Sequence, residues 1–222
     1  MSELRLKSTG TIKLFENDNT SNVTIASPAS LGADRTITLP DASVTLASGT
    51  MLATDGDGSS LTGLTPGITV ADQWRVTVGW TGNVNPIASN WEQVDSPGQG
   101  TVGSAMTESS GVFAFPSTGI YKIDFTIGGA YGTADVRYVH NFISFSDASA
   151  AMQPMAYSNQ HVYHQGAATY VTLHCCSLVD VTSTSTKKVS FSVFSDNASA
   201  TSFLNDSTHN YTYATFIRIG DT

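Results

Sequence analysis

Residues 111–127 read Gly-Val-Phe-Ala-Phe-Pro-Ser-Thr-Gly-Ile-Tyr-Lys-Ile-Asp-Phe-Thr-Ile, and this stretch decides the fold class. Phe113 and Phe115 alternate with small residues before a Pro-Ser-Thr-Gly turn. After the turn, four apolar side chains fall on one face: Tyr121, Ile123, Phe125 and Ile127. Alternation with period two on both sides of a turn predicts two successive strands, each with one buried face.

The same alternation recurs from about residue 68 to residue 222, between turns rich in Gly, Ser and Asn. No stretch has the periodicity of a convincing amphipathic helix. The strands predicted are 74–80, 111–115, 119–130, 136–145, 169–181, 189–194 and 211–219, with 153–163 as a further candidate. Many strands without helices predict an all-β sandwich or jelly roll.

The composition suggests three regions. Residues 1–52 hold short apolar pairs, such as Ile12/Leu14 and Val23/Ile25, each too small to bury its apolar face alone. Residues 53–67 are rich in Gly, Ser and Asp, which is typical of a linker. Its Asp-Gly-Asp-Gly run lacks the later ligands of a calcium loop. Residues 68–222 form the continuous β domain.

Charge and hydropathy exclude some partners. The formal net charge is -8 and only 13% of the residues are charged, so the clustered Lys and Arg that neutralise phosphates are missing and no nucleic acid is expected. No apolar run reaches the roughly 18–20 residues that span a bilayer, so no membrane insertion is expected. Because the start of the sequence has no apolar signal core, we expect a protein made in the cytoplasm.

The two cysteines are the neighbours Cys175 and Cys176. Neighbours on a strand point to opposite faces, so a disulfide between them would be strained, and we expect two free thiols with Cys175 on the core side. A structural zinc site would need four suitable ligands, and the cysteines alone do not supply them. The sequence therefore predicts no resident metal and no cofactor.

The third region, residues 68–222, resembles the globular head of the C1q/tumour-necrosis-factor superfamily. The matching residues are Phe113-x-Phe115-Pro116-x-x-Gly119-x-Tyr121-x-Ile123-x-Phe125, and the run 211–219 is similar to that family's closing strand. Leu178-Val-Asp180 followed by Lys188-Val-Ser-Phe191 resembles its penultimate hairpin. The resemblance implies a C1q/TNF-like jelly roll that forms a homotrimer.

A second resemblance concerns the first two regions. The runs 23–31, 36–40 and 53–58 look like segments of bacteriophage fibre and structural proteins, in which short β segments and a Thr-Asp-Gly hinge precede a distal head. The run 86–92 is similar to distal domains of such proteins. This resemblance implies a virion location and attachment to other virion proteins through the N-terminal segment.

Two of the predicted strands, 136–145 and 211–219, are apolar on both faces. This pattern favours a subunit contact, because a sandwich strand of a monomer keeps one face in water. The alternative is a cover supplied by a long loop of the same chain. The residues predicted to lie at a trimer seam are Tyr138, Phe142, Tyr211, Tyr213 and Phe216.

The segment 152–165 is predicted to be an aromatic recognition loop. Its binding candidates are Tyr157, His161, Tyr163 and His164, whose rings suit sugars or protein surfaces. Alternatively, the tyrosines cap the jelly roll or line the seam. His161 and His164 are also the best metal candidates, although in an extended chain they would face opposite ways.

No catalytic motif occurs: there is no Gly-x-Ser-x-Gly elbow, no phosphate loop and no His-Glu-x-x-His. The sequence therefore predicts a non-enzymatic trimeric fibre whose head binds a host surface polysaccharide or protein. Two alternatives stay open, a capsid-decorating trimer and a polysaccharide-degrading fibre.

Overall fold

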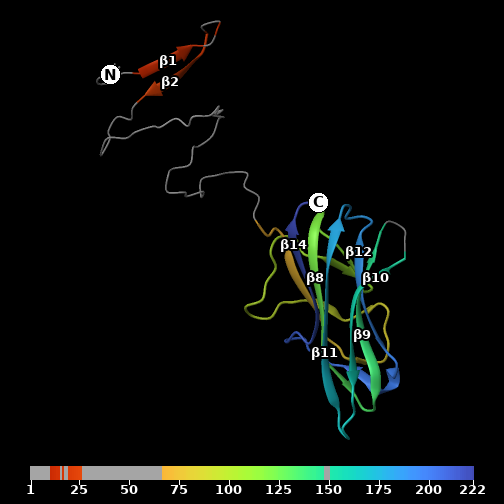
Figure 1. Cartoon of the computed structure of the whole chain (residues 1–222). Helices are drawn as coiled ribbons and strands as arrows, with labels where there is room; N and C mark the ends of the chain where they lie inside the picture. Colours follow the sequence, from red (N-terminus) through yellow and green to blue (C-terminus); the bar gives the residue numbers. More distant parts are fainter. Residues whose placement is uncertain (1–10, 16, 18–19, 27–66, 148–150) are drawn as a thin grey trace, which may run out of the picture. The chain divides into compact units, whose positions relative to one another are not determined.

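The computed structural model describes residues 11–15, 17, 20–26, 67–147 and 151–222, and the chain divides into two compact units, Met1–Leu61 and Thr62–Thr222 (Figure 1). In the first unit, β1 (Thr11–Phe15) and β2 (Asn22–Ala26) form an antiparallel hairpin, in which Ile12 is opposite Ile25. Two of the predicted short apolar pairs are thus strands. The other pairs of region 1–52, and the predicted linker apart from Gly67, lie outside the described residues.

The second unit is a sandwich of two antiparallel sheets (Figure 1). One sheet has five strands in the order β10-β9-β12-β7-β6. These strands are β6 (Thr107–Ser109), β7 (Val112–Ala114), β9 (Val136–Ser146), β10 (Gln153–Val162) and β12 (Lys188–Ser195).

The other sheet has seven strands in the order β4-β13-β8-β14-β3-β5, and β11 also pairs with β8. These strands are β3 (Ala71–Val76), β4 (Trp80–Thr81), β5 (Trp91–Gln93), β8 (Gly119–Gly132), β11 (Thr169–Val181), β13 (Thr201–Phe203) and β14 (Thr212–Gly220). Among the described residues, the single helical element is the 3-10 turn η1 (Ala198–Ala200), and no helix there is long and apolar enough to cross a membrane.

The strand predictions are confirmed wherever the alternation is long, as in β8, β9, β11, β12 and β14. The short strands β5, β6 and β13 were missed, because three residues are too few to show a period. The predicted loop 152–165 is wrong over most of its length: the chain there is the edge strand β10, paired along β9. The prediction of 153–163 as a further strand is the one that holds.

Aromatic rings join the two sheets at the centre of the core. The ring of Phe113 on β7 lies 5.5 Å from Phe191 in its own sheet and 5.3 Å from Phe216 on β14 in the other sheet. It also meets Trp74 and Trp91 edge to face, at 5.5 and 5.1 Å. Such pairs add to the stabilisation from burial alone, so Phe113 holds both layers at once.

The turn before β8 explains the glycine and tyrosine of the opening motif. Gly119 has a φ of +141°, and a Cβ there would lie 2.6 Å from the carbonyl oxygen of Gly220, so no larger residue fits. The hydroxyl of Tyr121 donates to the carbonyl oxygen of Ser117 at 3.0 Å. The turn is therefore fixed by backbone conformation at one end and by a buried side chain at the other.

Two buried charged residues on β3 hold the segment that follows β5. The carboxylate of Asp72 accepts hydrogen bonds from the side chains of Trp74 and Gln93 and from the backbone N–H of Met106, at 2.7–2.9 Å. The guanidinium of Arg75, fully buried, donates to Asp95 at 2.6 Å and is paired with Glu92. The charge of Arg75 is thus paired with carboxylates, and the carboxylate of Asp72 is satisfied by hydrogen bonds, as burial requires.

We expect Phe113→Ala to lower the free energy of unfolding by about 3–5 kcal/mol, because the substitution leaves a cavity between the sheets. Phe194→Ala is the matched control, since Phe194 is 46% exposed. Urea denaturation at one fixed protein concentration measures both. Equal effects of the two substitutions would contradict the central position of Phe113.

Cys175 lies in the core and is 6% exposed, and burial raises the pKa of its thiol to about 12. Since the thiolate is the reactive form, its fraction at pH 8 is on the order of 10⁻⁴. In the single-thiol variant Cys176→Ser we therefore expect iodoacetamide at pH 8 to leave Cys175 unmodified until urea unfolds the chain. Mass spectrometry reads the adduct, and rapid labelling of the folded protein would contradict this burial.

Candidate functional site

The outer face of β9 is aromatic because the strand alternates between two apolar sets. Val139, Asn141 and Ile143 are buried toward the core. Tyr138, His140 and Phe142 lie on the opposite face and are half-buried. The alternation thus places three successive aromatic rings on the outside of the five-stranded sheet.

Neighbouring strands extend this row of rings. Tyr157 on β10 is opposite Phe142, and Phe194 on β12 is opposite His140. We call the five residues the aromatic platform: Tyr138, His140, Phe142, Tyr157 and Phe194.

Neighbouring rings of the platform stack on one another. The His140 ring is stacked on Phe142 at 5.7 Å and on Tyr157 at 6.0 Å between centroids. The Tyr138 ring is stacked on Phe194 at 6.3 Å. Tyr157 is 61% exposed and Phe194 is 46% exposed, so ring faces are presented to solvent.

A groove of about 430 Å³ adjoins the platform. Its apolar wall includes Phe142, Phe194, Met152 and Pro154, and its polar wall is formed by Asn83, Asn85, Ser144 and Ser192.

Hydrogen bonds fix the polar wall in place. The Ser192 hydroxyl donates to Asn85 Oδ1 at 2.8 Å, and Asn83 Oδ1 accepts from the backbone N–H of Ser195 at 2.7 Å. The groove therefore combines an apolar floor with pre-positioned amides and hydroxyls, which is the usual composition of a binding site.

Charge at the platform is confined to one corner. Arg137 donates to Asp196 at 2.8 Å, and its guanidinium carbon lies 5.8 Å from the centre of the Tyr138 ring. The hydrogen bond from Arg137 lowers the pKa of the Asp196 carboxyl, so the pair stays ionised near neutral pH.

The four predicted binding residues do not form one cluster. Tyr157 belongs to the platform, whereas His161 and Tyr163 contact each other at 6.4 Å further along the chain. His164 is half-buried, and its backbone N–H donates to Asp135 Oδ1 at 2.8 Å. His140, Phe194 and the groove were missed, although the pattern Tyr-x-His-x-Phe at residues 138–142 was a signal for the first.

The predicted seam residues are divided between the two sheets. Tyr138 and Phe142 are on the five-stranded sheet, whereas Tyr211 and Tyr213 are at β14 of the seven-stranded sheet. The assignment of Phe216 to a subunit seam is wrong, because its side chain is fully buried between Phe113 and Phe191 within one chain.

The outer face of the seven-stranded sheet also carries apolar side chains. Four large ones on β11 or at the ends of β14 are 43–62% exposed: Tyr170, Leu178, Tyr211 and Ile219. Unlike the platform rings, they are spread over the whole length of the sheet. We call this set the apolar face.

No family model and no curated protein matches this sequence. Solved structures match in fold. Eiger TNF from S. frugiperda has a TM-score of 0.51 at 12% identity, over 71% of this chain and 96% of that chain. Murine APRIL has a TM-score of 0.47 at 11% identity, over 67% of this chain and 98% of that chain. The likeness to Eiger TNF confirms the TNF-like jelly roll that the sequence predicts.

Proposed function

We propose that this chain is a non-enzymatic virion appendage protein, a homotrimer whose jelly-roll unit binds a saccharide on the host surface. The aromatic platform and its groove carry the proposal. Sugar rings present apolar C–H faces that stack on aromatic rings, and they present hydroxyls that bond to amides and hydroxyl groups. The platform and the groove offer both kinds of contact side by side.

The shape and charge of the platform favour a neutral glycan chain. A row of rings on three adjacent strands suits an extended ligand, because successive sugar units can lie on successive rings. An anionic ligand would need several cations, whereas Arg137, which lies beside the platform ring of Tyr138, is already bonded to Asp196. Host polysaccharide is therefore the ligand class we favour over a charged protein surface.

Weak binding at one platform is sufficient if copies act together. Three heads on one fibre, and several fibres on one particle, turn each further contact into an intramolecular event, which raises the overall avidity by orders of magnitude. Adhesion of this kind needs no catalytic residue. It needs rigid placement of the ligand site, which strands supply better than loops.

We assign the trimer contact to the apolar face of the seven-stranded sheet. In a cyclic trimer each subunit presents one patch to the next subunit and receives it on another, so a broad apolar surface is required. Tyr211, predicted at the seam, belongs to this face, and Tyr213, also predicted there, lies two residues further along on β14. We propose that both patches belong to the seven-stranded sheet, which leaves the platform on the opposite sheet open to the host.

The N-terminal unit supports attachment to the particle. Its hairpin exposes Leu14 and Phe15, at 57% and 54%, which are apolar side chains that a partner protein can cover. We propose that this unit binds other virion proteins. Electron microscopy of intact particles labelled for this chain distinguishes a tail position from the capsid position of a decorating trimer.

Substitution of Tyr157 by alanine, combined with Phe194→Ala, should weaken binding of the cognate saccharide about tenfold or more, because stacked aromatic contacts contribute most at such sites. An array of bacterial surface polysaccharides identifies the ligand, and calorimetry with short fragments gives the affinity of a single site. A reducing-end assay on the same mixtures tests for cleavage.

Tyr170→Ala is the matched control, since Tyr170 is as exposed as Tyr157 but lies on the other sheet. Its fragment affinity should equal that of the unmodified chain. Binding that survives the platform double variant would rule out the platform as the ligand site, and release of reducing ends would replace adhesion with a degrading activity.

Light scattering of the full chain should give the mass of three copies. Leu178→Lys together with Ile219→Lys should shift the protein toward monomers, because charges on the apolar face cannot be desolvated without loss of free energy. Phe194→Lys, on the opposite sheet, should leave the mass unchanged. A monomer in the unmodified chain, or dissociation by Phe194→Lys alone, would contradict the assigned seam.

A further inference from the structure

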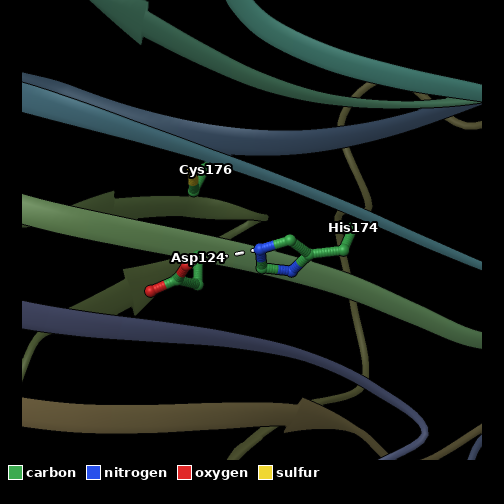
Figure 2. A group of neighbouring side chains, drawn as sticks. All are labelled: Asp124, His174 and Cys176. Atoms are coloured by element: carbon green, nitrogen blue, oxygen red, sulfur yellow. Dashed lines mark ion pairs between the residues drawn. The ribbon is translucent and has the colours of Figure 1, made fainter.

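Three side chains that commonly bind metals meet on the outer face of the seven-stranded sheet (Figure 2). Cys176 on β11 is opposite Asp124 on β8, and His174 lies two residues before Cys176 and so on the same face. Their ligand atoms lie within 4.8 Å of one another. In the described part of the chain, this is the one group of three or more His, Cys, Asp or Glu side chains at such distances.

The histidine is oriented by its neighbours. Its Nε2 lies 3.4 Å from Oδ1 of Asp124, and its Nδ1 lies 3.1 Å from the hydroxyl of Thr126. A hydrogen bond at Nδ1 leaves Nε2 as the nitrogen that can bind a cation, which is the usual arrangement around histidine ligands. Lys122 bonds to the other oxygen of Asp124, at 2.5 Å, so Oδ1 is the oxygen directed to the histidine.

We propose that Asp124, His174 and Cys176 bind one zinc ion per chain, with water at the fourth position. The donor set of one thiolate, one imidazole and one carboxylate suits zinc, whose bonds to these atoms are about 2.0–2.3 Å long. A tetrahedral ion then separates its ligands by roughly 3.3–3.7 Å. The histidine–aspartate distance already has this value, and rotation of the exposed Cys176 side chain brings its sulfur in.

The other thiol of the chain does not compete for the ion. Cys175 points into the core and is buried, so its sulfur is not available on this face. The sequence prediction of no metal weighed the adjacent cysteines and the pair His161 and His164. The register of β8 and β11 instead places a carboxylate from about 50 residues away beside His174 and Cys176.

The test is zinc binding by the full chain, kept reduced with a phosphine and measured by calorimetry and by metal analysis after gel filtration. We expect one zinc per chain. Asp124→Asn, His174→Gln and Cys176→Ser should each weaken binding at least tenfold, and cobalt should give a thiolate charge-transfer band that Cys176→Ser abolishes although Cys175 is retained. Because the ligands must lose protons, affinity should fall as the pH is lowered.

His209→Gln is the matched control. His209 Nδ1 also lies near an aspartate, 3.3 Å from Asp206 Oδ1, but this pair has no thiol, so its removal should leave zinc binding unchanged. The site is overturned if the unmodified chain binds no zinc, or if the three ligand variants bind it as well as the control does. Light scattering on the same samples tests the trimer separately. A protein that binds zinc but is a monomer would contradict the proposed trimer and leave the zinc site standing.

Discussion

The contact of Phe113 with rings from both sheets is the constraint on which the jelly roll depends. Each sheet has one apolar face to bury, and the Phe113 ring fixes β7 against Phe191 of its own sheet and Phe216 of the other. Once those rings are inside, every strand in register with them has a determined orientation, because side chains alternate along a strand. A slip of one residue in β12 or β14 would turn Phe191 or Phe216 out to solvent.

The same alternation determines what the outside presents. With Val139 and Ile143 inside, β9 must display Tyr138, His140 and Phe142, and pairing with β10 and β12 adds Tyr157 and Phe194 to complete the aromatic platform. With Leu173 and Cys175 inside, β11 must display His174 and Cys176 next to β8. Both proposed sites are therefore consequences of how the core is packed, and neither relies on a long flexible loop.

Long alternating runs were sufficient to predict the major strands, the core side of Cys175 and the jelly roll itself. The sequence was insufficient to predict which side is buried where a strand has two apolar faces. On β14, alternation puts Tyr213 and Phe216 on opposite faces but does not indicate which face is inside. The prediction therefore put Phe216 at the surface. The sequence was also insufficient to predict that Asp72 and Arg75 are buried. A charged residue is expected at the surface unless its partners are known. The partners of the zinc cluster and the platform come from different strands, and only the register brings them together.

The two outer faces differ in a way that matches the separate functions proposed for them. The platform concentrates rings beside a groove with fixed amides, so it offers both stacking and hydrogen-bond contacts in one place. The apolar face spreads isolated side chains such as Leu178 and Ile219 over a sheet, so it can be covered only by another extended surface. The zinc site proposed between β8 and β11 lies on the same sheet face as the proposed trimer contact. The proposed metal site and the proposed trimer contact therefore share one sheet, whereas the proposed saccharide contacts lie on the opposite sheet.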